Sequence, residues 1–365
     1  MPKNKIWNEL DLLCSLGIGL EAIAPDMARL LRELVGAEAT TIFWLDERGM
    51  PAGFFHEDSP AHIRELFLNE FERLFVGAAE INVAHLAQSH ASRIGHLLAP
   101  PASYFQSNTY NLLVRPSGHH HALDLRIDLR GQARAVVLLF RPKGQPFDPS
   151  HAALLQQASP YLERALAAQD LQPKWCANTS LQAHMVVNAG GTQILMQSPQ
   201  ASALLGNANL VGTGLRLSGG SSAPPTFIRQ LCAQIPQSQR RAAALPAEAS
   251  HSSTCSFAVP GGQLRASATP LLAAHMAAAN AAHQVLITLD FMQPAALHAA
   301  RKVMALEVSP LQREIALMAG LGRDRGDCPQ TLGVSKEALK KHLRTVYAAA
   351  GVGNWEDLSA ALSRA

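Results

Sequence analysis

Hydrophobic positions near the end of the chain recur with the period of a helix. Over Val334–Val352, reading VSKEALKKHLRTVYAAAGV, the apolar positions follow an i, i+4, i+7, i+8, i+11 pattern. They are Leu339, Leu343, Val346, Tyr347 and Ala350. Ser335 is a suitable N-cap, and Gly351 stands where a left-handed residue is expected to end the helix. The pattern predicts a helix with an apolar back, and most of the charged residues on its other faces are basic.

Short helices are predicted on both sides of this basic helix. Upstream, Ser309 and Gln312 form a capping box around Pro310, and an apolar stripe follows it. Downstream, Asn354 can cap a last helix that carries Leu358 and Leu362. Several capped helices in fewer than about sixty residues favour a compact all-α head.

The first half of the chain predicts a sheet flanked by helices. Helices are expected at Trp7–Val35, Ile63–Phe75 and Ser150–Ala168, and strands at Thr41–Leu45, Ala52–His56, Leu123–Leu129 and Ala135–Phe140. Leu123–Leu129 alternates apolar with charged residues, so one buried and one solvent-exposed face are predicted. Ala135–Phe140 is apolar on both faces, which indicates a central strand. Helices and hairpins in this order favour an antiparallel sheet covered by helices.

After Pro173 a second unit with strands begins. Strands are expected at Met185–Asn188, Gln193–Met196, Leu264–Thr269 and Val285–Leu289, with a short helix at Ser198–Gly206 and a loop at Gly219–Pro225. The last two strands are expected to pair with each other, although an Ala/His-rich stretch separates them, and a helical connector is predicted for Gln293–Leu306. The fold class is therefore expected to be α+β and multidomain, with an all-α C-terminal head.

Composition narrows the class of protein further. The chain has 365 residues, 48% of them hydrophobic, and a net charge of +3, so binding to nucleic acid requires a local basic patch. No apolar run approaches the ~18 residues of a membrane span, and the N-terminus lacks the apolar core of a signal peptide. A cytoplasmic protein that does not insert into membranes is expected. Five scattered cysteines without a CxxC spacing suggest neither a disulfide framework nor a zinc site.

The C-terminal pattern resembles the LuxR/FixJ (GerE-type) helix-turn-helix family. The matching residues are Ser309-Pro310, Glu314-Ile315, Leu332-Gly333-Val334-Ser335, Lys340-x-His342-Leu343, Val346-Tyr347 and Gly351-Val352, leading into the Asn354 helix. The resemblance implies a bacterial transcription regulator that binds double-stranded DNA as a homodimer formed through the last helix, residues 354–362. Its DNA contacts to phosphates or bases would come from Lys336, Lys340, Lys341, His342 and Arg344. Glu337 could read the exposed amine of cytosine.

One segment departs from the family pattern. Where relatives carry a regular scaffold helix, this chain has Arg323-Asp-Arg-Gly-Asp-Cys-Pro329-Gln-Thr-Leu332. Gly and Pro are poor residues for a helix interior, so the helix is expected to start at or just before Pro329. Arg323 and Arg325 would then lie in an exposed loop, from which they could reach a DNA backbone.

The two units upstream resemble sensor domains. Element order and the closing RPKGQPFDPSHAALLQQASPYLERAL make residues 1–170 similar to a GAF domain, and residues 176–292 resemble a degenerate PAS domain. Residues 293–306 form the connector and residues 307–365 the DNA-binding head. Receiver-domain residues and an acyl-homoserine-lactone domain are not recognisable. Phosphorelay control is therefore disfavoured, and quorum sensing is not assumed.

Aromatic residues of the first unit suggest where an effector could bind. Clustered aromatic side chains line a ligand cavity or form the core of the domain, and the sequence does not decide between them: Trp44, Phe54, Phe55, Phe67, Phe71, Tyr104 and Phe105.

Histidines raise two weaker alternatives. His119, His120 and His121 invite a metal site, but consecutive residues cannot all converge on one ion, so structural or surface roles are favoured. The PAS-like part holds further histidines that could ligate haem, although solvated side chains are favoured: His184, His251, His275 and His283. No cofactor is expected, and nothing resembles a catalytic site.

Two functions from different classes remain open. The first is a transcription regulator controlled by an unidentified small molecule. The second is an interaction protein that has lost DNA binding and antagonises partners by dimerising with them. The irregular segment 323–332 motivates the second hypothesis.

Overall fold

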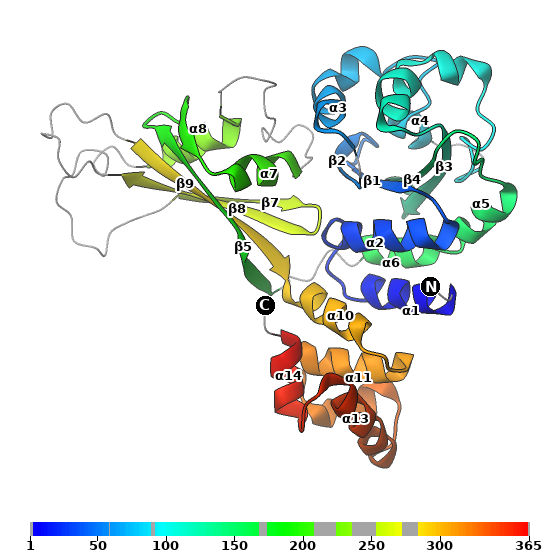
Figure 1. Ribbon diagram of the computed structural model, residues 1–365, viewed down its shortest axis with the longest axis vertical. Helices are drawn as coiled ribbons and strands as arrows, with labels where there is room; N and C mark the ends of the chain where they lie inside the picture. Colours follow the sequence, from blue (N-terminus) through cyan, green and yellow to red (C-terminus); the bar gives the residue numbers. More distant parts are fainter. Residues whose placement is uncertain are drawn as a thin grey trace, which may run out of the picture.

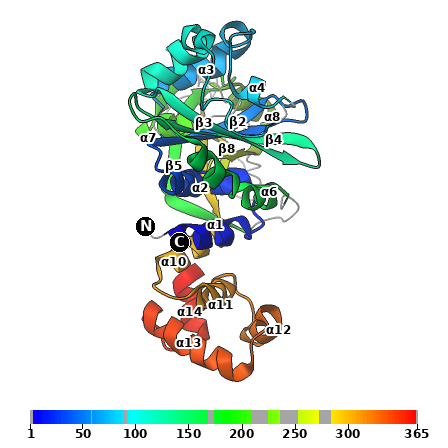
Figure 2. The same cartoon turned by 90° about the vertical axis from the view of Figure 1, so that its right-hand side faces the viewer.

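The computed structural model describes residues 3–57, 59–88, 92–167, 174–207, 224–235, 253–271 and 284–363. They form two antiparallel sheets, helices that pack on them, and a helical C-terminal region (Figure 1). The predicted α+β class with an all-α C-terminal region is therefore confirmed. Figure 2 shows the C-terminal helices on one side of the molecule, away from both sheets.

The first sheet has four strands in the order β2-β1-β4-β3. They are β1 (Ala39–Leu45), β2 (Pro51–His56), β3 (His121–Leu129) and β4 (Gln132–Arg141). β4 pairs with both β1 and β3, as its apolar faces predicted. One face packs on α1 (Lys3–Cys14), α2 (Leu20–Val35), α5 (Pro149–Gln156) and α6 (Ser159–Ala167). The other carries α3 (Ala61–Leu74), α4 (Val83–Leu86) and the short helices η1 (Ala102–Gln106), η2 (Thr109–Val114) and η3 (Arg115–Ser117).

Two long helices predicted in this unit are each divided in two. Gly17 and Gly19, at φ of 72° and 87°, separate α1 from α2, because a left-handed backbone interrupts a right-handed helix. Asp148 caps α5 through a capping box with His151. α6 then begins anew, with Pro160 in its first turn, where the missing N–H of proline costs no hydrogen bond.

The charged face predicted for β3 is not solvent-exposed. Asp124 is 1% exposed and Arg126 is 6% exposed, because the segment before η1 folds over them. The Asp124 carboxylate accepts a hydrogen bond from Leu97 N at 2.7 Å and contacts His96 Nδ1 at 2.9 Å. Arg126 donates from Nε to Asp128 at 2.8 Å. The alternation identified the strand correctly. The predicted solvent exposure of its charged face was wrong, because the segment before η1 buries Asp124 and Arg126 and both form hydrogen bonds.

The second sheet has five strands in the order β6-β5-β9-β8-β7. Its strands are β5 (Trp175–Asn188), β6 (Ile194–Gln197), β7 (Ser253–Val259), β8 (Gly262–Leu271) and β9 (Gln284–Pro294), and it carries α7 (Pro199–Asn207) and α8 (Thr226–Gln234). The predicted pairing of the strands around Leu264–Thr269 and Val285–Leu289 is confirmed. The sequence missed β7, whose Ser and Thr residues give little apolar signal. The Ala/His-rich stretch and most of the predicted 219–225 loop lie outside the described residues.

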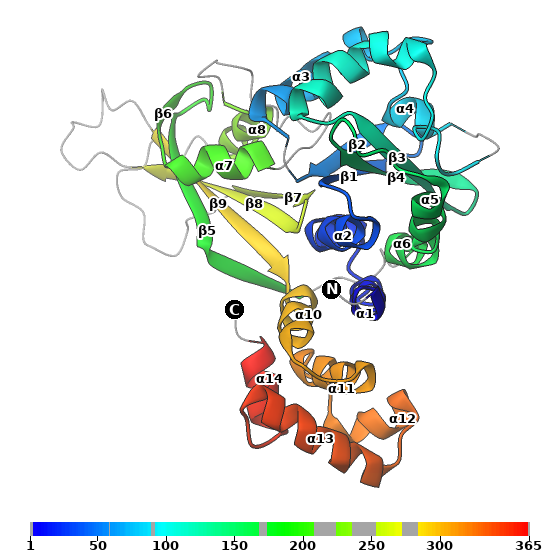
Figure 3. The ribbon, with the colours of Figure 1, turned by 45° about the vertical axis from the view of Figure 1, so that its right-hand side comes forward.

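Helix α2 connects the two sheets (Figure 3). The backbone C=O of Glu21 accepts a hydrogen bond from Gly261 N, in the β7–β8 turn, at 3.0 Å. Pro25 lacks the N–H that would otherwise bond this carbonyl within the helix. The next residue of α2, Asp26, forms an ion pair with Arg301 of α10 (Ala295–Ala305) at 2.9 Å. The first unit therefore contacts both the second sheet and the connector helix.

The C-terminal region follows α10 directly. It contains α11 (Pro310–Gly320), η5 (Arg325–Asp327), α12 (Cys328–Leu332), α13 (Lys336–Ala350) and α14 (Trp355–Ser363). Gly320 lies where α10, α11 and α14 meet, because a Cβ placed there would come within 2.9 Å of Ala299 Cβ and 3.1 Å of Leu362 Cβ. Ser309 and Gln312 form the predicted capping box of α11.

Candidate functional site

Helix α13 carries the basic surface that the sequence predicted. Ser335 Oγ accepts a hydrogen bond from Ala338 N at 3.1 Å, and Gly351 ends the helix at φ 66°. Leu339, Leu343 and Val346 are buried against the other C-terminal helices. The apolar stripe thus anchors the helix and leaves its opposite side to solvent.

Most of the predicted DNA-contacting residues of α13 lie on the exposed side. Lys336, Glu337, Lys340, Lys341 and Arg344 are exposed, and His342 is half-buried. Among the described residues, none of the four cations forms an ion pair within 4.0 Å. Their charges are available to a polyanion that approaches the helix.

The irregular segment before α13 forms the short helix that its proline predicted. α12 has five residues, with Pro329 in its first turn, and Gly333 closes it at φ 64°. Arg323 and Arg325 are both exposed. One detail differs from the predicted loop: Arg325–Asp327 make a single 3₁₀ turn, in which Asp324 Oδ1 accepts from Gly326 N at 2.5 Å. Trp355 Nε1 donates to Arg323 O at 3.2 Å and ties this turn to α14.

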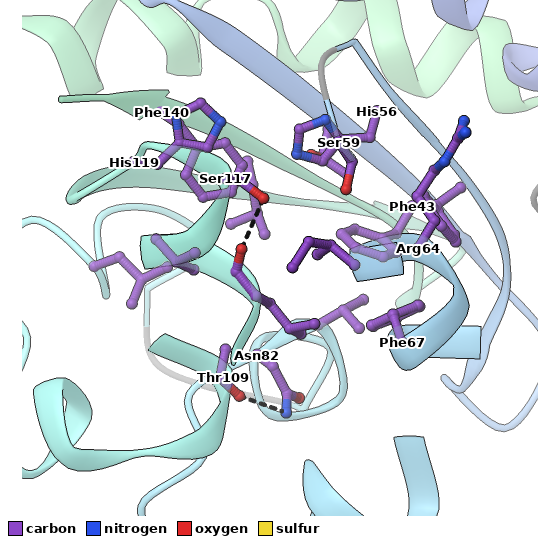
Figure 4. A pocket seen from close by; sticks show the side chains of 18 of the residues that line it. Phe43, His56, Ser59, Arg64, Phe67, Asn82, Thr109, Ser117, His119 and Phe140 are labelled. Carbon is purple, nitrogen blue, oxygen red and sulfur yellow. Dashed lines mark hydrogen bonds between the residues drawn. The ribbon is translucent and has the colours of Figure 1, made fainter. Parts of the chain in front are cut away.

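A cavity of about 80 Å³ lies on the outer face of the first sheet, between the sheet and the segments α3, α4 and η1–η3. Figure 4 shows its lining side chains converging from strands and helices on either side. Alternation along the strands decides which residues reach it, since Thr41 and Phe43 of β1 and Phe54 and His56 of β2 share one face.

Aromatic rings form much of the cavity wall. Phe43 lies 5.5 Å from Phe54 and 5.5 Å from Phe67, and Phe54 meets Phe67 edge-on at 5.1 Å, between ring centroids. Tyr104 and Phe140 complete the aromatic part of the lining. Such packing fixes the ring positions and gives the cavity a stiff, apolar wall.

Asn82 holds the loop that closes one side. Its Nδ2 donates to Phe75 O at 2.6 Å and to Thr109 Oγ1 at 3.3 Å, the latter drawn in Figure 4. Its Oδ1 accepts from Ala84 N at 3.0 Å and caps α4. A carboxylate oxygen of Glu80 accepts from Thr109 N at 2.8 Å. These bonds join the start of η2 to the α3–α4 segment and so fix the cavity's lower rim.

Two histidines face the cavity next to Phe140. His119 stacks on the Phe140 ring at 4.9 Å, and His56 lies 6.0 Å from His119. Loss of solvent around His56, and repulsion from His119, lower the pKa of His56 to about 3. His56 is therefore uncharged at neutral pH.

The consecutive histidines do not act together. His119 lines the cavity, whereas His120 contacts Tyr110 Oη at 2.6 Å and stacks on Phe105. Across the described part of the chain, no group of three or more His, Cys, Asp or Glu residues is placed to hold a metal ion. Of the PAS-like histidines, His184 is exposed on β5, and His251, His275 and His283 lie outside the described residues.

Only some of the aromatic residues predicted for a ligand cavity line it, and others lie on the opposite face of the sheet. Phe54, Phe67 and Tyr104 line the cavity. Trp44 and Phe55 do not, because their neighbours in the strand occupy that face and they pack on the opposite side with the α1–α2 core.

Two further aromatic residues lie near the cavity but do not line it. Phe71 belongs to the core behind Phe67, and Phe105 is 36% exposed beside His120. Phe43, Thr41 and Phe140 were missed, although strict alternation from Phe54 through the hairpin would have indicated the first two.

Comparisons with known proteins give no family for the chain. No protein-family model matches it, and no curated protein matches it significantly. Similar solved structures include the E. coli DhaR(N)–DhaL complex, at 12% identity over 78% of this chain and 87% of that chain, with a TM-score of 0.25. The phage VqmA–DPO complex matches at 14% identity over 50% of this chain and 81% of that chain, with a TM-score of 0.20. The sensor region of a sensor histidine kinase matches at 12% identity over 76% of this chain and 90% of that chain, with a TM-score of 0.17.

Within the residues that the structure describes, no helix combines the length and apolar character needed to cross a bilayer.

Proposed function

We propose that the chain is a cytoplasmic DNA-binding transcriptional regulator of the LuxR type, controlled by a small molecule bound in its N-terminal unit. The observation that carries this is the exposed side of α13, with Lys336, Lys340, Lys341 and Arg344 unpaired among the described residues and an apolar stripe anchoring the helix behind them. A helix of this form suits the major groove, where its cations meet phosphates and base edges.

The shape of the head supports the same function. α12 and α13 are joined by a tight turn at Gly333, so α12 lies at the N-terminal end of α13. Arg323 and Arg325 precede α12 and add two exposed cations, and Arg323 O accepts a hydrogen bond from Trp355 Nε1 of α14. In a helix-turn-helix the first helix crosses the DNA backbone while the second enters the groove. The arginines would then contact phosphates while α13 reads bases.

The effector site proposed for this regulator is the cavity on the first sheet, within residues 1–170. Its apolar wall and few polar groups are typical of a small-molecule site. We further propose GAF-like and PAS-like units at 1–170 and 176–292, a connector at 293–306 and a head at 307–365. The proposed homodimer would use the outer side of α14, because its apolar residues Trp355, Leu358 and Leu362 are buried within the chain.

A specific observation favours the second function, that of an interaction protein. α12 has five residues and provides a short scaffold for α13. If the head had lost DNA binding, the chain would act by dimerising with partner regulators through α14. This function requires no contact between α13 and DNA.

The experiment that separates the two functions is genome-wide DNA capture with the full chain. The matched control is the full chain with Lys340→Ala and Lys341→Ala, which keeps the α13 core intact. Regulator function predicts enrichment of discrete genomic sites by the native chain and its loss in the variant. No enrichment by the folded native chain would instead support the interaction-protein function.

A further inference from the structure

A second hollow, of about 330 Å³, lies between the two units. The first unit contributes Arg64 of α3 and the end of its edge strand β2, residues 55–57. The second unit contributes an apolar wall that consists of Leu181, Leu204, Val259, Pro260, Leu264 and Phe291. Small-molecule sites are typically of this size or larger, and they occur preferentially at junctions between domains.

Strand pairing gathers the apolar wall on one face of the second sheet. Leu264 of β8 is the cross-strand partner of Phe291 on β9. On β5, Leu181 precedes Gln182, which pairs with Asp290, so Leu181 and Phe291 point to the same face. Helix α7 packs on β5 and supplies Leu204. The wall is therefore built from three neighbouring strands and one helix.

Part of this apolar wall is open to solvent. Leu181 is 37% exposed, whereas Leu264, two strands away, is 1% exposed. Phe55 on the facing unit and Phe291 are half-buried. Exposed apolar side chains that gather in a hollow mark binding sites, because covering them removes apolar surface from water. A ligand with an apolar body would cover side chains of both units at once.

The contact between the units adjoins the hollow. Pro260 lies in the β7–β8 turn, where Gly261 N donates to Glu21 O of α2 at 3.0 Å. A Cβ on Gly261 would lie 3.4 Å from Pro25 Cγ and 3.6 Å from Phe291 Cζ. The turn that holds the second sheet against α2 therefore also contributes to the wall, and a molecule bound there would contact both units.

The charges along the first-unit wall favour an anion. The Glu57 carboxylate is neutralised within its own unit, because Arg32 Nε lies 3.2 Å from it. His56 is uncharged at neutral pH, since loss of solvent lowers its pKa and repulsion from His119 and Arg64 lowers it further. Two guanidinium groups and one carboxylate leave a net positive charge on this side, and Arg64 is the cation that lines the hollow.

The volume sets the size of the ligand. An apolar cavity of about 150 Å³ takes one benzene ring, so a hollow of about 330 Å³ corresponds to roughly two fused rings with one substituent. We propose that this hollow binds an apolar organic acid of that size, with its body against Leu181 and Phe291 and its carboxylate at Arg64. The inference does not rest on the proposed function, and it adds a second ligand site that joins the two units.

The probes 2-naphthoate and 2-naphthamide test the proposal, because they have the same number of non-hydrogen atoms and differ in a carboxylate against a neutral amide. Calorimetric titration of the full chain is expected to show 2-naphthoate binding about tenfold more tightly. This is the lower end of what a hydrogen bond to a charged group contributes, as suits the half-buried Arg64. Arg64→Gln should bring the two affinities together. The matched control Arg73→Gln removes an exposed cation of the same helix and should keep the preference.

A second pair of variants tests the apolar wall from the other unit. Leu181→Trp places a larger side chain at an exposed position of the hollow and should cost both probes most of their affinity. Leu195→Trp is the matched control, because Leu195 is a similarly exposed leucine, 41% exposed on β6, that does not line the hollow. It should bind both probes as the native chain does. Since Arg64 and Leu181 lie in different units, a variant that fails to fold leaves the other test intact.

Each of four results would overturn the proposal: no binding of either probe, 2-naphthamide binding as tightly as 2-naphthoate, a preference that survives Arg64→Gln, or unchanged affinities in Leu181→Trp. The last result would place the probes elsewhere, such as in the smaller cavity of the first sheet, which Leu181 does not line. The titration contains no DNA. Its failure therefore leaves the DNA interface of α13 standing, and a chain that fails to bind DNA still gives a decisive titration.

Discussion

Replacing Lys340 and Lys341 by alanine together should weaken DNA binding and flatten its dependence on salt. Both side chains are exposed, and neighbouring residues project about 100° apart around a helix axis. They cannot both reach one phosphate, so the double variant removes two separate contacts. Each phosphate contact contributes about 0.9 to the slope of log affinity against log salt, and the slope should therefore fall by about 1.8.

This change in slope is large enough to measure directly. Between 50 and 200 mM salt, a fourfold change, a slope of 1.8 corresponds to about a twelvefold difference in affinity. Native chain and variant are compared by fluorescence anisotropy on a captured genomic fragment and on an unrelated duplex. Since phosphate contacts carry no sequence information, both duplexes should lose affinity alike.

A second double variant controls for the loss of two positive charges. Arg48→Ala with Lys143→Ala removes the same charge from exposed residues of the first unit. It should leave the slope within a few tenths of the native value. An unchanged slope and affinity for the Lys340/Lys341 variant would exclude α13 from the interface and favour the interaction-protein function.

Three further predictions concern the two arginines before α12, two helix glycines and His56. Alanine at both Arg323 and Arg325 should reduce DNA affinity while the melting temperature stays nearly unchanged, because both side chains are exposed; a large drop in melting temperature would contradict this. Gly320→Ala should destabilise the chain by about 1–3 kcal/mol through overpacking, whereas Gly206→Ala, with open space around it, should stabilise by up to about 1 kcal/mol in thermal unfolding. The pKa of His56 is lowered to about 3 in the folded chain. As pH drops below ~6.5, the unfolded chain therefore takes up a proton that the folded chain does not. The free energy of unfolding should then fall by up to about 1.4 kcal/mol for each pH unit. His56→Gln should lessen that fall in chemical denaturation.

Capping residues and hydrophobic periods were sufficient to predict the C-terminal helices. Ser309, Ser335 and Asn354 each accept the backbone hydrogen bond expected of an N-cap, because this interaction depends only on residues within one turn. The effect of Pro329 on α12 was predictable for the same reason. What the period alone could not supply was the break between α1 and α2, where Gly17 and Gly19 take left-handed backbone angles.

The cavity was only partly predictable, because its lining depends on which face of each strand meets the helices. Phe54 and Phe55 are adjacent aromatic residues with equal composition signals, yet the first lines the cavity and the second packs on the opposite core. The sequence could not show that Asp124 and Arg126 would be covered. Their burial depends on hydrogen bonds with residues more than twenty positions earlier in the chain: Leu97 N donates to Asp124, and Arg126 donates to Gln88 O.

Pro25 shows why the junction between the two sheets could not be predicted. Within a helix, proline removes one hydrogen bond and costs about 3 kcal/mol when the carbonyl four residues earlier is left without a donor. In this chain that carbonyl, of Glu21, bonds to Gly261 N at 3.0 Å instead. Gly261 has a φ of 84°, and its Cα approaches the Pro25 ring closely enough that a Cβ would lie 3.4 Å from Cγ. The local sequence therefore predicts a weakened helix. In the folded chain the Glu21 carbonyl instead holds the β7–β8 turn against α2. A sequence pattern contains only the proline, and the partner that offsets its cost comes from the other unit.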